Sequence, residues 1–328
     1  MQFNPTKKAL LRRLADGGFH SGATLARELG LTRTAVWALV HELESLGLEI
    51  HSVRGKGYRL THPLELLDAG LIRAGLSDAA AASLASLEVH DQLDSTNNEL
   101  QRGLRSATGS RVCLAECQTA GKGRIGRNWQ SPFAGNICLS LLWRFPDHSA
   151  LAGLSLAVGV AAVRALQAVG AAGIGLKWPN DLLWRGRKLG GILLEVSGEA
   201  HGSFAVVIGI GLNGYLPRAW AQHIDQPWSD LREILGSAPL PRNRLVTGLL
   251  EQLLGLLAAY PERGLTAVLD EWRGYHCQQG QSACLYLGDQ RISGTIAGVD
   301  DQGQLLLDTA EGRKTYASGD LRLRTAGD

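Results

Sequence analysis

The sequence predicts an α+β fold of three units, because helix patterns and strand patterns do not alternate regularly along its 328 residues. Short helical patterns and a basic glycine-rich turn occupy residues 1–62. Hairpin-like strand patterns around one long apolar helix occupy residues 63–271, and short strands separated by turns occupy residues 272–328. We therefore predict three domains with these limits, a mixed sheet in the second and a small β-barrel in the third.

Composition is that of an ordinary globular chain, with 45% hydrophobic and 20% charged residues. No apolar run approaches the ~20 residues of a membrane-spanning helix, and the basic N-terminus lacks the apolar core of a signal peptide. Five cysteines are too few, and odd in number, for a secreted disulfide framework. We therefore expect a cytoplasmic protein with reduced thiols and no membrane partner.

The first unit has the pattern of a winged helix-turn-helix. Three helical patterns fill residues 7–47, and Thr32 fits the N-cap of the third. Two short β-like runs then flank the basic turn RGKG at residues 54–57, which has the pattern of a wing. A third helix followed by a basic hairpin predicts a recognition helix and a wing.

Charge in this unit favours a nucleic-acid partner. Residues 1–62 hold nine Lys and Arg against five Asp and Glu, whereas the remainder of the chain carries a net negative charge. A small helical domain with a solvated basic face is the alternative, but helix-turn-helix and basic wing together favour DNA binding. The residues predicted to contact DNA are Thr32, Arg33, Thr34 and Trp37 of the helix, and Arg54, Lys56 and Arg59 of the wing.

The stretch GKGRIG at residues 121–126 has the glycine spacing of a dinucleotide-binding loop but the wrong surroundings. Such a loop opens a helix, whereas the strand-like run ICLSLLWRF follows here at residues 137–145. A Walker loop is excluded because Gly123 stands where Ser or Thr is required. Glycines interleaved with Lys122, Arg124 and Arg127 instead predict a loop between two strands that surrounds phosphate oxygens.

Polar residues gather at the ends of the predicted strands of the central unit. They are Ser95, Thr96, Asn97, Gln118, Lys177, Asn180, Asp181, Lys188 and Asn213. Asp181 is a candidate ligand of Mg²⁺, and Lys188 can reach a phosphate, although an ordinary surface ion pair between them is the alternative. No lysine precedes the x-Asp-Gly pattern of ligases that adenylate their own lysine, so we expect a different mechanism.

Five ordered motifs together resemble the biotin–protein ligases. They are STNNEL, ECQTAGKGRIGRNWQSP, KWPNDLLW, GRKLGGILLE and VIGIGLN, and the winged helix in front of them resembles the bifunctional BirA type, which also represses biotin-synthesis genes. The resemblance implies a class II synthetase-like catalytic domain, an SH3-like C-terminal barrel, and formation of biotinyl-5′-AMP from biotin, ATP and Mg²⁺. It implies transfer of biotin to the biotin carboxyl carrier protein of acetyl-CoA carboxylase, and a homodimer on operator DNA with biotinyl-5′-AMP as corepressor.

The same resemblance implies roles for particular residues. Those implied for biotin are Ser95, Thr96, Asn97, Gln118, Lys122, Gly123, Arg124 and Lys188. Those implied for ATP are Gly121, Arg124, Arg127, Trp129, Asn180, Asp181 and Asn213, with Asp181 beside the metal. The implied catalytic residues are Arg124, Asp181 and Lys188. Lys122 stands where the family commonly has arginine, which keeps the charge and loses a bidentate donor.

Two other interpretations stay open. The winged helix of an active ligase can have lost its regulatory role, or a biotin-sensing repressor can have lost catalysis; intact Arg124, Asp181 and Lys188 argue against the second. A lipoate ligase shares a related core, but the glycine-arginine loop and the KWPND motif favour biotin.

Overall fold

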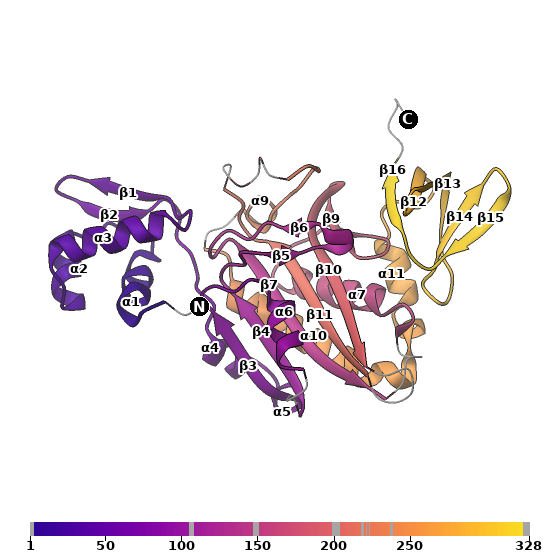
Figure 1. Cartoon of the computed structure of the whole chain (residues 1–328), viewed down its shortest axis with the longest axis horizontal. Coiled ribbons are helices and arrows are strands. Elements are labelled where there is room, and N and C mark those ends of the chain that lie inside the picture. The colour runs from indigo at the N-terminus through magenta and orange to yellow at the C-terminus, as the bar shows by residue number, and fades with distance from the viewer. Residues whose placement is uncertain are drawn as a thin grey trace.

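The computed structural model describes residues 3–104, 108–146, 151–198, 204–217, 220, 222, 224–236 and 239–323. Three units follow one another along its long axis (Figure 1). A helical unit with a small hairpin lies at one end, a seven-stranded sheet covered by helices lies in the middle, and a five-stranded sheet lies at the other end.

The N-terminal unit confirms the predicted winged helix-turn-helix. Its helices begin at residues whose side chains accept a backbone N–H of the first turn, as Asn4, Ser21 and Thr32 do. Leucines and valines of all three helices form one buried cluster. The elements are α1 (Pro5–Leu14), α2 (Gly22–Leu29), α3 (Arg33–Glu44), β1 (Ile50–Val53) and β2 (Gly57–Leu60).

The central sheet is mixed, as predicted. Its strand order is β3-β4-β7-β11-β10-β9-β8, in which β3 and β4 are parallel and every other neighbouring pair is antiparallel. The strands are β3 (Leu84–His90), β4 (Ser110–Ala115), β7 (Asn136–Phe145), β8 (Ile174–Lys177), β9 (Asp181–Trp184), β10 (Arg187–Gly198) and β11 (Phe204–Asn213). The turn between β8 and β9 contains Pro179, which explains why the strand pattern is interrupted there.

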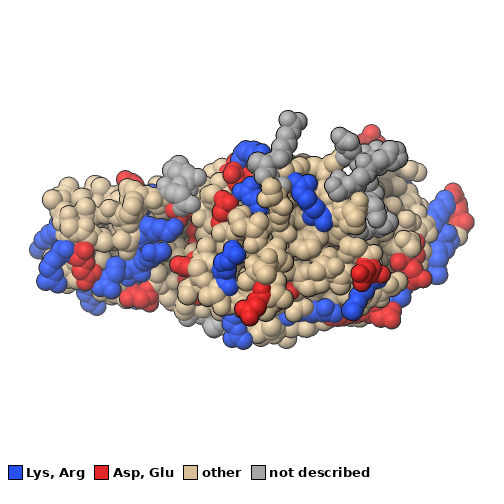
Figure 2. Space-filling model, turned by 90° about the horizontal axis from the view of Figure 1, so that it is seen from below, with Lys and Arg blue, Asp and Glu red and all other residues tan. Residues whose placement is uncertain are grey.

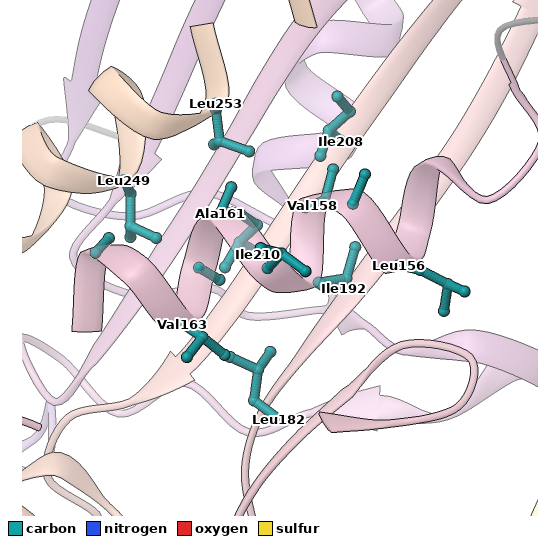
Figure 3. Close-up of a cluster of buried hydrophobic side chains, with 14 of the residues drawn as sticks. Leu156, Val158, Ala161, Val163, Leu182, Ile192, Ile208, Ile210, Leu249 and Leu253 are labelled. Atoms are coloured by element: carbon teal, nitrogen blue, oxygen red, sulfur yellow. The ribbon is translucent and has the colours of Figure 1, made fainter. Parts of the chain in front are cut away.

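Most helices pack on one face of this sheet and bury a large apolar core, whereas α6 packs on the other face. Figure 3 shows α7 between α10 and the strands, with Ile208 and Ile210 of β11 beside the helix. Helix α7 is apolar on most of its circumference because both the sheet and α10 cover it. The helices are α4 (Ala69–Ala74), α5 (Asp78–Ser83), α6 (Thr96–Arg102), α7 (Leu154–Ala168), α9 (Leu231–Leu235), α10 (Arg242–Arg263) and α11 (Leu269–Tyr275).

The C-terminal sheet has the order β15-β14-β13-β12-β16 and does not confirm the predicted barrel. Its edge strands, β15 and β16, are not paired with each other over the part of the chain that the structure describes. The strands are β12 (Ser282–Leu287), β13 (Gln290–Val299), β14 (Leu305–Thr309), β15 (Gly312–Tyr316) and β16 (Asp320–Leu323). The domain limits at residues 62 and 271 stay predictions. No described helix is long and apolar enough to cross a membrane.

Candidate active site

A cleft of about 430 Å³ opens at one end of the central sheet. The glycine-rich stretch forms one wall, as a hairpin of strands β5 (Gly121–Lys122) and β6 (Asn128–Trp129) joined by a short 3-10 turn, η1 (Arg124–Gly126). The predicted position of this stretch between two strands is therefore confirmed. Predicted site residues that line the cleft are Ser95, Thr96, Asn97, Gln118, Lys122, Gly123, Arg124, Arg127, Trp129, Asn180, Asp181, Lys188 and Asn213.

Two of the predicted residues, Gly121 and Asn213, shape the chain around the cleft. Gly121 does not line the cleft, and a Cβ there would lie 2.6 Å from the Trp129 carbonyl oxygen. Glycine at this position therefore allows β5 and β6 to pair closely. The Asn213 side chain donates to the Lys188 and Ser229 carbonyl oxygens at 3.3 and 3.1 Å, so it fixes the connection after β11.

The floor of the cleft is a buried network of neutral polar groups. Ser95 caps α6, and the following Thr96 donates its backbone N–H to Gln118 Oε1 at 2.8 Å. Ser140 Oγ of β7 lies 2.7 Å from Thr96 Oγ1 and 2.5 Å from Asn97 Oδ1. Because the Asn97 oxygen can only accept, the single Ser140 proton is donated there. The floor is therefore rigid and already satisfied by hydrogen bonds within the chain.

The network continues from the floor to the hairpin. Asn97 donates from Nδ2 to Glu195 Oε2 at 2.7 Å, and Lys122 donates to Glu195 Oε1 at 3.2 Å. One carboxylate of β10 therefore receives hydrogen bonds from both the floor and the cationic hairpin.

Glycines of β11 make room for two site residues. A Cβ at Gly209 would lie 2.4 Å from Asn97 Oδ1, and a Cβ at Gly211 would lie 2.6 Å from the Trp129 ring. Because side chains alternate along a strand, both positions face the same side of the sheet. The GIG sequence of this strand thus has a steric reason: Asn97 and Trp129 rest directly on its backbone.

Cations dominate the wall opposite the floor. Lys188 Nζ lies 2.8 Å from Asp181 Oδ1, and Lys177 Nζ lies 3.9 Å from the other oxygen of the same carboxylate. Burial lowers the pKa of Lys177 and outweighs the opposing effect of Asp181, while nearby Lys188 lowers it further. Arg124 donates to Asn180 Oδ1 at 3.1 Å. Burial also lowers the pKa of Arg124, although a guanidinium stays charged at neutral pH. The wall carries more positive than negative charge and is suited to an anion.

The C-terminal sheet closes one side of the cleft. Asp320 and Leu321, at the start of β16, line it. Arg127 donates to Asp320 Oδ2 at 2.6 Å, and Arg124 donates to the Gly319 carbonyl oxygen at 3.4 Å. Two cations of the hairpin are therefore fixed by a unit almost 200 residues away in the sequence.

The donor set fits a magnesium ion bound mainly by phosphates. No cluster of three or more His, Cys, Asp or Glu suitable for a metal occurs among the described residues. Asp181, the predicted ligand, lies close to two lysines through both carboxylate oxygens. Mg²⁺ commonly takes only one or two carboxylates and completes its shell with water and substrate phosphates, which this site allows.

Comparisons with known proteins agree along the whole chain. Family models match residues 6–59 (HTH domain), 89–213 (Biotin/lipoate A/B protein ligase family) and 283–324 (Biotin protein ligase C terminal domain). The chain is 37% identical to the bifunctional ligase/repressor BirA of Salmonella typhimurium over 97% of each chain. It is 36% identical to that of Escherichia coli over 99% of each. The chain belongs to the bifunctional biotin ligase/repressor family.

A solved member of the wider ligase family has the same fold in the part that it shares. The biotin protein ligase from Aquifex aeolicus, solved in complex with biotin and ATP, superposes with a TM-score of 0.63 at 26% identity. The match covers 74% of this chain and all of that one.

The residues predicted to contact DNA lie on the N-terminal unit, away from the cleft. Trp37 of α3 is 52% exposed, and Arg33 and Thr34 are exposed one turn earlier. Figure 2 shows Lys and Arg side chains, interspersed with acidic ones, on this unit at the left end of the molecule. Thr32 accepts the Ala35 N–H at 3.1 Å, so its side chain caps the helix.

The wing cations have an aromatic support that the sequence did not reveal. The Arg59 guanidinium lies 4.8 Å from the centre of the Phe19 ring, and Lys56 Nζ lies 5.7 Å from it. Arg54 is exposed in the turn between β1 and β2.

Sequence reasoning missed several residues of the site, among them Ser140, Glu195 and Asp320. Ser140 and Glu195 are polar residues inside the apolar strands ICLSLLW and GGILLEV, and that contrast with their neighbours was the available signal. Asp320 had no such signal, because only the packing of the C-terminal sheet brings it to the cleft.

Proposed function

We propose that this protein is an ATP-dependent biotin–protein ligase that makes biotinyl-5′-AMP and transfers biotin to a lysine of biotin carboxyl carrier protein. One observation carries the proposal: a single cleft joins a buried neutral polar floor to a wall of cations. A ligand with an uncharged hydrogen-bonding head and an anionic tail fits such a cleft. Biotin has this chemistry, with a ureido ring at one end and a carboxylate at the other.

Different groups of the ligand bind at the two ends of the cleft. We assign the ureido ring to the floor formed by Ser95, Thr96, Asn97 and Gln118. The biotin carboxylate and the phosphate that activates it lie beside Lys122, Gly123, Arg124 and Lys188. The adenylate and the leaving phosphates occupy the side formed by Arg127, Trp129, Asn180, Asp181 and Asn213, with Gly121 holding the hairpin strands together behind it. The half-buried Trp129 ring provides an aromatic surface for the base.

In the first step, a carboxylate oxygen of biotin attacks the α-phosphorus of ATP, and the bond from that phosphorus to the pyrophosphate oxygen breaks. Negative charge grows on the phosphate oxygens, which Arg124 and Lys188 stabilise from fixed positions. Mg²⁺ neutralises phosphate charge when it is bound, with the Asp181 carboxylate as the protein ligand. Asp181 also holds Lys188 in place through their ion pair.

In the second step, the neutral amino group of the carrier lysine attacks the acyl carbon of biotinyl-5′-AMP. The carbon–oxygen bond to AMP breaks, an amide forms, and the lysine proton leaves to solvent. The carrier supplies the nucleophile, so this chain needs only to hold the mixed anhydride and to exclude water from it. The hairpin, fixed to the C-terminal sheet through Arg127, covers the site on its open side.

The N-terminal unit makes the protein a repressor as well. We propose that the cytoplasmic protein binds operator DNA of biotin-synthesis genes as a homodimer, with biotinyl-5′-AMP as corepressor. The exposed recognition helix and the basic wing support this role. We also propose that the C-terminal sheet is an open form of the SH3-like domain of the family, and that it assists ATP and carrier binding.

Label transfer tests the ligase function directly. The protein is incubated with labelled biotin, ATP, Mg²⁺ and a biotin carrier domain, and label on the carrier is measured. We expect transfer by the wild type and by Lys314→Met, an exposed lysine of β15, and a loss of at least ~100-fold in Lys188→Met. A folded wild type that transfers no label contradicts the ligase function.

A mobility-shift assay tests the repressor function. Operator DNA should be retarded only when biotin and ATP are both present, because the adenylate is the proposed corepressor. Retardation that is indifferent to biotin favours a winged helix without this regulatory role.

A further inference from the structure

We propose that Glu195 is a positioning residue that connects the cleft floor to the glycine hairpin and thereby sets how long biotinyl-5′-AMP is retained. This inference rests on the proposed ligase function. Glu195 does not line the cleft, yet its two carboxylate oxygens receive one hydrogen bond from the floor residue Asn97 and one from the hairpin residue Lys122.

The contact with Asn97 fixes the orientation of a buried amide. Asn97 is 3% exposed, and its carbonyl oxygen accepts from Ser140 while its amino group donates to Glu195. Rotating the amide by half a turn would place its oxygen against the Glu195 carboxylate, which has no proton to donate, whereas the Ser140 hydroxyl can either donate or accept. Glu195 therefore determines which polar atoms of the floor face the ligand.

The contact with Lys122 fixes one corner of the hairpin. Arg124 and Arg127 of the hairpin contact the C-terminal unit, at the Gly319 carbonyl oxygen and at Asp320, whereas Lys122 contacts Glu195 of β10. Strands β5 and β6 are only two residues long and pair only with each other in the described sheets, so side-chain contacts place the hairpin over the cleft. The contact between Lys122 and Glu195 connects the hairpin to the floor, because Glu195 also accepts from Asn97.

The ion pair is suited to placing a loop more than to stabilising the fold. The Lys122 and Glu195 side chains are 41% and 28% exposed, and pairs this exposed add little to folding. A change in the pair should therefore alter ligand retention without a large change in melting temperature.

Four variants separate the two contacts. Glu195→Gln keeps an oxygen that accepts from Asn97 and loses the charge that holds Lys122. Lys122→Met leaves the Asn97 contact in place, and it removes both the hairpin contact and the direct contact proposed between Lys122 and the ligand. The double variant Lys122→Met/Glu195→Gln tests whether the two act through each other, and Lys122→Arg restores a cation. Lys314→Met is the control, because it removes an exposed lysine of β15 far along the C-terminal sheet.

The measurements are the dissociation rate of preformed biotinyl-5′-AMP, the Kd of biotin and the melting temperature. We expect Glu195→Gln to release the adenylate ~2–5-fold faster and Lys122→Met to release it at least as fast as that. The double variant should be no faster than Lys122→Met, and Lys122→Arg should approach the wild type. The biotin Kd should stay within about twofold in Glu195→Gln, because the Asn97 contact is kept.

Two outcomes overturn the inference in different ways. The role of Glu195 alone is overturned if the wild type transfers label normally but Glu195→Gln releases the adenylate at the wild-type rate. It is also overturned if the effects of the two substitutions on the release rate multiply in the double variant. A wild type that neither retains adenylate nor labels the carrier overturns the ligase function on which the inference rests.

Discussion

The Arg127 guanidinium donates to the Asp320 carboxylate at 2.6 Å, which joins the glycine hairpin to the first residue of β16. Asp320 also accepts from Arg322 at 3.0 Å, so one carboxylate is shared by two cations. The C-terminal sheet therefore takes part in the proposed ligase site, because it holds in place a cation that lines the cleft.

Removing this carboxylate should weaken ATP binding. We expect Asp320→Asn to raise the KM for ATP by about three- to tenfold, since the negative charge that pairs with Arg127 is lost and the remaining hydrogen bond holds Arg127 less firmly. Asp308→Asn is a matched control: Asp308 pairs with Arg313 at 2.7 Å in the same sheet, at exposed positions. Steady-state kinetics with varied ATP measure the effect, and equal KM values in both variants would contradict it.

The effect of Asp320→Asn should not depend on pH between about 6 and 8. Burial raises the pKa of Asp320, but hydrogen bonds from Arg322 and Arg127 outweigh it, so the pKa lies below its ordinary value. A carboxyl with a lowered folded pKa keeps its contact fully above its unfolded pKa of ~4 and loses it as pH falls through the folded value. KM ratios measured across this range test the statement, and a ratio that rises or falls with pH argues against it.

A methyl group at Gly211 should disturb the ligand site more than the fold. The added Cβ would lie 2.6 Å from the Trp129 ring, so the ring must move out of its place beside the cleft. We expect Gly211→Ala to lower kcat/KM at least ~10-fold, with a stability loss of about 1–3 kcal/mol from overpacking. Label transfer and urea unfolding measure the two effects.

The matched control for that variant is Gly255→Ala. Gly255 lies on an exposed face of α10, and nothing lies within 4 Å of an added Cβ. Alanine there should raise the free energy of unfolding by about 0.5–1 kcal/mol and leave label transfer unchanged. Full activity in Gly211→Ala would show that Trp129 needs no fixed position.

The wing should contact DNA phosphates. Lys56 is exposed in the turn beside β2 and rests on Phe19. We expect Lys56→Met to weaken binding to any duplex and to reduce the slope of log K against log salt by about one. Fluorescence anisotropy at several salt concentrations measures the slope, with Lys314→Met as the comparison. An unchanged slope would show that Lys56 does not contact DNA phosphates.

Local rules predicted much of the fold and most of the cleft. The cap at Thr32 and the strand setting of the glycine stretch depend on neighbouring residues, and both were predicted from the sequence. The motifs around Lys177 and Gln118 fall at strand ends, which is where the structure brings them together.

Long-range packing set what the sequence could not predict. Asp320 reaches the cleft from a different sheet, and Glu195 connects Asn97 to Lys122 across separate elements. The predicted barrel is not confirmed for the same kind of reason: the strands and turns agree with the sequence patterns, but whether β15 pairs with β16 depends on how the sheet curves.

A buried ion pair beneath the site gives the largest expected effect on stability. Arg242, at the start of α10, lies 2.6 Å from Glu116 outside hydrogen-bond geometry, and the two side chains are 3% and 2% exposed. Arg242 also donates to the Asn136 carbonyl oxygen, and Glu116 accepts the Leu67 N–H. The pair therefore connects α10 to the strand that precedes Gln118.

Removing one partner leaves a buried charge without compensation. We expect Arg242→Met to lower the free energy of unfolding by about 3–5 kcal/mol, and Arg242→Met/Glu116→Gln to recover part of that loss because neither charge is then left alone. Arg244→Met is the matched control, since Arg244 lies two residues further along α10 and makes an exposed contact with the Ala168 carbonyl oxygen. Urea unfolding followed by circular dichroism measures all three variants. A double variant less stable than Arg242→Met would mean that the hydrogen bonds of the pair, more than its charges, hold α10 against the sheet.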